Sequence, residues 1–147
     1  MIIGIDFDGT CVTHDFPDIG KDIGAIPVLK RLIASGHKLV LWTMRSDIEV
    51  VSTIDPTIHA AGGKYLSAAV DWFCENGIPL YGVNENPEQR TWTDSPKAYC
   101  QLYIDDAALG CPLYVDNSMS AERGNVIYAD WKVIDLWLLR NGYYEDI

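Results

Sequence analysis

The predicted architecture rests on the stretch Ile2-Ile3-Gly4-Ile5-Asp6-Phe7-Asp8-Gly9-Thr10, in which an apolar run leads into two carboxylates and a Gly-Thr turn. The run from Ile2 to Ile5 favours a β-strand. Side chains two residues apart on a strand point the same way, so Asp6 and Asp8 are expected to converge at its carboxyl end. Converging carboxylates repel each other unless a proton or cation lies between them, and such hard oxygen ligands suit Mg²⁺. A plain strand end in a polar turn is the alternative.

The composition fits one globular domain spanning residues 1–147. The hydrophobic fraction is 48%, which argues against disorder, and the length suits one core. The formal net charge of -10 disfavours nucleic acid and anionic membranes through repulsion. It leaves room for a small phosphorylated substrate, because a metal and a few basic groups reverse the sign locally. With no leader or membrane-spanning run in the sequence, we expect a cytoplasmic protein without membrane contact.

The chain has four cysteines and no CxxC pair, so a structural zinc site is not expected. Cys11 directly follows the stretch Asp6–Thr10, and both a reactive and a packing role are open for it. Aromatic residues gather near the carboxyl end, and besides core packing they would allow a homo-oligomeric contact: Trp131, Trp137, Tyr143 and Tyr144.

The order of the predicted elements indicates an α/β fold. Apolar spacing and turn residues predict helices over 25–35, 64–76 and 130–140, and further strands over 38–42, 78–83 and 98–104. Two short β-like runs follow at 112–115 and 125–128, while 46–63 reads as an excursion with one or two helical turns that would lie near the site. Alternating strands and helices imply a mainly parallel, Rossmann-like sheet covered on both sides, a three-layer sandwich.

Polar residues follow the predicted strands where ligands bind in parallel sheets, outside the carboxyl ends. Asp6 and Asp8 follow the first strand, Thr43 the second, and Asp105-Asp106 the fourth. Lys97 lies just before that fourth strand, where a loop would have to bring it to the same edge. Carboxylates for a metal, a hydroxyl and an ammonium are the groups that phosphoryl transfer requires.

These motifs resemble the haloacid dehalogenase (HAD) superfamily of phosphatases. The matching residues are Asp6-Phe7-Asp8-Gly9-Thr10, Leu41-Trp42-Thr43, Lys97 and Tyr103-Ile104-Asp105-Asp106, in that order over about residues 2 to 110. The superfamily often inserts a cap domain after the first or third strand. Here the two gaps, 11–24 and 84–96, are short, so the chain resembles a small capless member.

The resemblance implies a Mg²⁺-dependent phosphomonoester hydrolase that acts through an aspartyl-phosphate. Asp6 would be the nucleophile and a metal ligand, and Asp8 the general acid and base with its backbone carbonyl on the metal. Thr43 would hold a phosphate oxygen with the Met44 amide, and Lys97 would balance charge. Asp105 would ligate Mg²⁺ with support from Asp106, the direct ligand of the two being open.

Arg45 and His59, which both lie beyond the second motif in the sequence, are candidates for substrate contact. For each, a solvated surface position is the competing interpretation.

Three other functions compete with the phosphatase. A receiver-like signalling domain uses similar groups, but in a different order along the chain. A phosphate-binding module would keep the same residues for binding but would not hydrolyse the phosphate ester. A nucleic-acid end phosphatase would suit an open site, yet the charge of -10 and the lack of a basic stripe oppose it.

Overall fold

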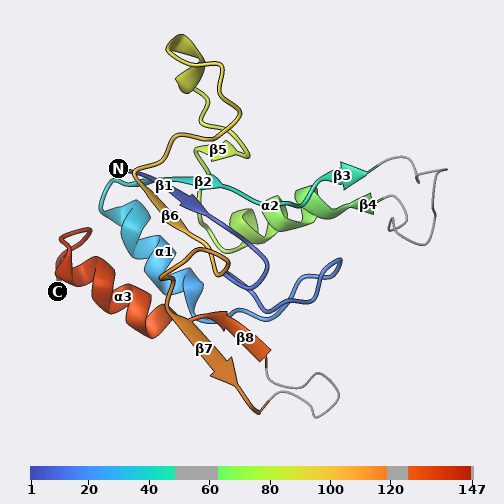
Figure 1. Ribbon diagram of the computed structural model, residues 1–147, viewed down its shortest axis with the longest axis vertical. Helices are drawn as coiled ribbons and strands as arrows, with labels where there is room; N and C mark the ends of the chain where they lie inside the picture. The colour runs from blue at the N-terminus through green and yellow to red at the C-terminus, as the bar shows by residue number, and fades with distance from the viewer. Residues whose placement is uncertain (49–62, 119–125, 147) are drawn as a thin grey trace.

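The computed structural model describes residues 1–48, 63–118 and 126–146, and within them the elements alternate as an α/β protein does (Figure 1). Their bounds, in chain order, are β1 Ile2–Ile5, α1 Ala25–Ala34, β2 Lys38–Leu41, β3 Asp47–Ile48, β4 Gly63–Lys64, α2 Tyr65–Glu75, β5 Gly82–Val83, the 3-10 turn η1 Gln89–Thr91, β6 Leu102–Ile104, β7 Leu113–Asp116, β8 Val126–Ala129 and α3 Trp131–Arg140.

Four of these strands form the predicted parallel sheet in the order β5-β2-β1-β6. Ile5 of β1 pairs with Leu41 of β2 on one side and Ile104 of β6 on the other. The fold class is therefore confirmed. The strands over 78–83 and 98–104 are shorter than predicted, because only the residues at their carboxyl ends have a partner in register.

All three helices contribute to one core cluster on one face of the sheet. Alternation points Ile3 and Ile5 to this face, and they share the cluster with Leu29 of α1, Phe73 of α2 and Leu138 of α3.

The opposite face is covered by the segment between β5 and β6. Val40 packs there with Ala98 and Cys100 in a second cluster. The layer beyond this face is therefore formed by a connecting segment with one 3-10 turn, part of which projects at the top of Figure 1.

Two antiparallel strand pairs, β3–β4 and β7–β8, lie outside the four-stranded sheet. β3 pairs with β4, so Ile48 lies in a strand and not at the start of the helical turns expected within 46–63. Residues 49–62 of that excursion lie outside the described residues. The two β-like runs near 112–128 form the hairpin β7–β8, at the bottom of Figure 1.

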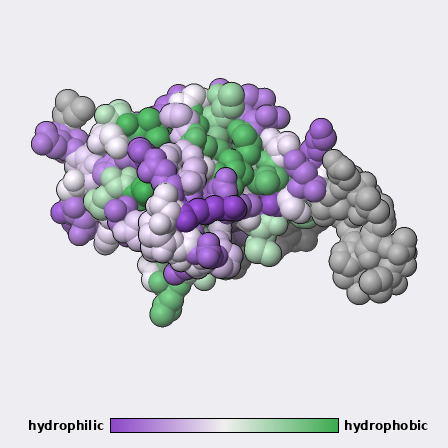
Figure 2. Space-filling view, turned by 90° about the horizontal axis from the view of Figure 1, so that it is seen from above, coloured by the Kyte–Doolittle hydropathy of each residue, from purple (hydrophilic) through white to green (hydrophobic). Residues whose placement is uncertain are grey.

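The surface carries exposed apolar side chains among polar ones, as the face in Figure 2 shows. Trp131 and Tyr144 are buried, whereas 46% of Trp137 is exposed. A homo-oligomeric contact through these aromatics stays a prediction. Among the helices of the described ranges, none has the length and apolarity that a bilayer crossing requires.

Candidate active site

The parallel register lines up the polar residues that follow β1, β2 and β6. The Asp6 amide donates to the Ile104 carbonyl at 3.0 Å, and the Trp42 amide donates to the Ile5 carbonyl at 2.8 Å. Asp105 and Thr43 therefore follow their strands directly beside the end of β1. This is the carboxyl edge at which ligands bind in such sheets.

Three carboxylates meet at this edge. Oxygens of Asp6, Asp105 and Asp106 all lie within 4.8 Å of one another. The Thr10 hydroxyl donates to Asp6 Oδ2 at 2.8 Å and accepts from the Asp106 amide at 3.0 Å, so it ties the β1 loop to the β6 loop. Partly buried carboxylates with this spacing offer the hard oxygen ligands that Mg²⁺ prefers, and the donor set fits that ion.

Asp6 has an unusual protonation behaviour. Burial and, to a smaller extent, the charges of Asp105 and Asp106 together raise the pKa of its carboxyl to about 7, although the hydrogen bond from Thr10 lowers it. A divalent cation among these three groups would favour the ionised form of Asp6.

His14 contacts the cluster through Asp106, and the sequence patterns do not reveal this contact. Its Nε2 lies 2.9 Å from Asp106 Oδ2, and the ring is largely exposed on the flap that follows the first motif. Gly9, with φ of 77°, makes room for this contact, because a Cβ there would lie 1.9 Å from His14 Nε2. The Gly-Thr turn is therefore required sterically as well as for its backbone conformation.

The prediction that the Asp6 and Asp8 carboxylates converge is wrong, because Asp8 does not join the three-carboxylate cluster and its carboxylate binds Arg45 instead. Arg45 Nε donates to Asp8 Oδ2 at 2.8 Å, and Nη2 donates to Asp8 Oδ1 at 2.7 Å. The Arg45 side chain is 1% exposed. The prediction that Arg45 contacts the substrate is wrong for this structure, because its guanidinium is enclosed by the protein.

Thr43 and Met44 follow β2 as predicted. The Thr43 amide donates to Asn84 Oδ1 at 2.8 Å, which joins the ends of β2 and β5. The Thr43 hydroxyl accepts from the Arg45 amide at 3.1 Å and has no acceptor among the described residues, so its own hydrogen could donate to a ligand oxygen. The Met44 side chain is almost fully exposed.

Lys97 is not brought to the acidic cluster. Its ammonium lies over the Tyr103 ring, 5.3 Å from the centroid. Within residues 1–48, 63–118 and 126–146, it forms no ion pair with the predicted catalytic carboxylates. Its role beside Asp6 therefore stays a prediction that no contact supports. His59 lies outside the described residues.

Cys11 has a packing role. It is fully buried and its thiol donates to the Asp6 carbonyl at 3.3 Å. Burial, followed by the charge of Asp6, raises the pKa of the Cys11 thiol well above its usual range. The reactive alternative is excluded by this environment, because a reactive thiol requires easy ionisation and access.

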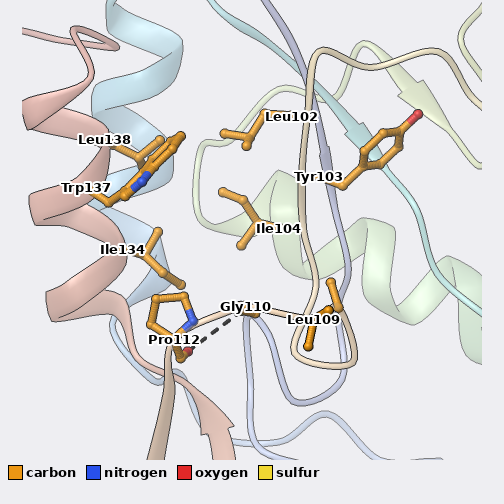
Figure 3. Close-up of a pocket in the computed structure, with 11 residues that line it drawn as sticks. Leu102, Tyr103, Ile104, Leu109, Gly110, Pro112, Ile134, Trp137 and Leu138 are labelled. Atoms are coloured by element: carbon orange, nitrogen blue, oxygen red, sulfur yellow. Dashed lines mark hydrogen bonds between the residues drawn. The ribbon is translucent and has the colours of Figure 1, made fainter.

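An apolar cavity lies apart from these groups. It measures about 280 Å³, between β6 and α3 (Figure 3). In the close-up, Leu102 and Ile104 point toward Trp137 and Leu138, whereas Tyr103 points away. No carboxylate lines this cavity, so it is not the candidate active site.

Sequence comparison assigns no family to this chain: no protein-family model and no curated protein matches it. A solved structure, described as that of the conserved protein coded by a locus from Bacteroides thetaiotaomicron, has 29% sequence identity and a TM-score of 0.67. The match between the two covers 96% of this chain and 91% of the chain in that structure. The likeness supports the α/β fold over the length of the protein, and the description of that structure names no activity.

Proposed function

We propose that this protein is a Mg²⁺-dependent phosphomonoester hydrolase of the HAD type, in which Asp6 forms an aspartyl-phosphate. The observation that carries the proposal is the meeting of Asp6, Asp105 and Asp106 at the carboxyl edge of a parallel sheet. The hydroxyls of Thr10 and Thr43 lie on loops of the same edge. Asp105 and Asp106, from the β6 loop, would hold the ion together with Asp6.

The chain's own residues supply the chemistry. Asp6 Oδ attacks phosphorus, and the bond from phosphorus to the leaving oxygen breaks. Asp8 gives its proton to that oxygen, and then takes a proton from the water that cleaves the acyl phosphate. Thr43 donates to an equatorial phosphate oxygen. Mg²⁺ would neutralise phosphate charge and orient the ester for in-line attack.

The experiment measures hydrolysis of p-nitrophenyl phosphate by the purified protein, in Mg²⁺ and in EDTA. We expect turnover that requires Mg²⁺ and falls at least about 10³-fold in Asp6→Asn, because covalent catalysis is removed. Asp71→Asn, on the exposed face of α2, is the matched control and should keep wild-type turnover. Full activity of Asp6→Asn would overturn the proposal.

The covalent intermediate can be detected separately. In Asp8→Asn, the loss of the base slows hydrolysis of the acyl phosphate, so ³²P from a labelled substrate should stay on the protein and be released by hydroxylamine. Label that persists in Asp6→Asn would assign another nucleophile. If the wild type neither turns over nor accepts label across a phosphometabolite panel, a binding role without turnover replaces the proposal.

A further inference from the structure

The buried guanidinium of Arg45 donates a hydrogen bond from every one of its N–H groups. A guanidinium carries five N–H groups. Two bind the Asp8 carboxylate, as described above, and Nη2 also donates to the Asp18 carbonyl at 2.8 Å. Nη1 donates to the carbonyls of Pro17 at 3.3 Å and Tyr65 at 3.2 Å. All five N–H groups are therefore used, and none is left for a ligand.

Two aromatic rings pack against the same guanidinium. Arg45 Cζ lies 5.1 Å from the centroid of Phe7 and 5.1 Å from that of Phe16. Phe16 also packs edge-on against Tyr65, with centroids 5.2 Å apart. Arg45 thus joins three segments that are separate in sequence: the β1 loop, the flap of residues 11–24 and the start of α2.

Stability alone is a weak reason for such an arrangement. Burying an ion pair costs desolvation free energy that its attraction often only balances, and apolar replacements are frequently as stable. What a two-pronged Arg–carboxylate pair adds is orientation, since both oxygens are fixed in one plane. Here the fixed carboxylate belongs to the residue that the proposed function assigns to proton transfer.

We propose that Arg45 is a positioning residue that fixes the Asp8 carboxylate and the flap as one unit at the edge of the active site. The inference rests on the proposed function for the role of Asp8. The Asp8 side chain stays 19% exposed, so it is still accessible to solvent. Each carboxylate oxygen accepts from Arg45 with one lone pair and keeps another for the proton that Asp8 transfers. Arg45 adds no chemical step; it sets where that proton is delivered.

The test compares two substrates on the same samples of Arg45→Gln. An alkyl phosphate such as glycerol phosphate needs its leaving oxygen protonated, whereas p-nitrophenyl phosphate leaves without that help. We expect kcat for the alkyl ester to fall about tenfold or more beyond any fall for the aryl ester. The ratio of the two rates is independent of the amount of folded protein, so partial unfolding does not imitate the effect.

Two further variants complete the design. Arg45→Lys keeps the positive charge but cannot donate to both Asp8 oxygens at once. Its alkyl-to-aryl rate ratio should lie between those of the wild type and Arg45→Gln. Arg31→Gln removes the surface pair between Arg31 and Asp135 and should leave the ratio unchanged. Equal losses for both esters in Arg45→Gln would make Arg45 merely structural, and a rise in kcat would mean that the pair holds Asp8 back. Either result overturns the inference.

Hydrogen exchange tests the flap without enzymatic turnover. In Arg45→Gln, the amides of residues 11–24 should exchange faster than in Arg31→Gln, because the carbonyls of Pro17 and Asp18 lose their donor. If the wild type is inactive, the proposed function fails and this measurement still decides the docking of the flap. If the amides of residues 11–24 exchange at the same rate in both variants, Arg45 does not hold the flap in place, whatever the enzymatic activity.

Discussion

The raised pKa of Asp6 makes its ionised form unfavourable in the metal-free fold. The pKa lies near 3.8 in the unfolded chain and at about 7 in the folded protein. Between these values the native state holds a proton that the unfolded state has lost, so stability falls as pH rises. The favourable contribution is fully present below pH 3.8 and is lost as the pH reaches about 7.

We therefore expect the free energy of unfolding in EDTA to decrease between pH 5 and pH 8 in the wild type but much less in Asp6→Asn. At pH 8 the variant should be more stable by about 1–3 kcal/mol, after allowance for partial exposure of the carboxylate. Urea denaturation at a series of pH values measures the difference. If the stability of the two proteins depends on pH in the same way, the raised pKa of Asp6 is contradicted.

Thr10 is the residue that joins the two acidic loops. Replacing its hydroxyl with a methyl group in Thr10→Val leaves the Asp106 amide and Asp6 Oδ2 without their partner. We expect kcat/KM to fall about tenfold or more, in keeping with a lost hydrogen bond to a charged group. Thr10→Ser keeps the hydroxyl and should retain most activity, so steady-state kinetics of the pair separates hydrogen bonding from packing.

Sequence patterns predicted that Asp6, Asp105 and Asp106 meet, but they wrongly placed the Asp8 carboxylate in the same cluster and did not predict its contact with Arg45. Asp6, Asp105 and Asp106 follow strands that were predicted to share one parallel sheet, so they were expected at the same edge, and the pairing of β1 with β6 brings them together. The burial of Arg45 depends on the path of the flap, which contains no periodic signal. The contact of His14 with Asp106 likewise depends on a loop-to-loop approach across 92 residues of sequence.

At the scale of elements, α3 shows how local sequence defines a boundary. The Asp130 side chain accepts from the amides of Lys132 at 3.1 Å and Val133 at 3.3 Å, which satisfies two donors at the start of the helix. We expect Asp130→Ala to lower the free energy of unfolding by about 1 kcal/mol. Asp130→Asn should lose less, and urea denaturation that shows equal stability for all three proteins would contradict the cap.

The helices matched their predictions more closely than the strands did, for a physical reason. A helix satisfies its hydrogen bonds within one segment, so α1, α2 and α3 were predictable from spacing and end residues. A strand extends only as far as its neighbour does. The predicted strand over 78–83 pairs only at Gly82 and Val83, and the length of that partnership is a tertiary property.

At the scale of the whole molecule, the net charge of -10 opposes the approach of a phosphate ester. Added salt screens this repulsion over about 8–10 Å. We expect KM for a small phosphomonoester to decrease several-fold between about 10 and 150 mM NaCl, with kcat nearly constant. A 5′-phosphorylated oligonucleotide, which carries more charge, should show a larger change. A KM that rises with salt would indicate a basic binding surface instead.

The loop of Asp6 and Asp8 is closed by residues from the last part of the chain. The Ala129 amide donates to the Gly9 carbonyl at 2.9 Å, and Trp131 Nε1 donates to the Thr10 carbonyl at 2.6 Å. At about 5–20 residues per second, synthesis separates these partners by on the order of ten seconds. The acidic loop is therefore completed only after Trp131 has been synthesised, and a ribosome-bound intermediate that lacks this residue would leave the loop without these two hydrogen bonds.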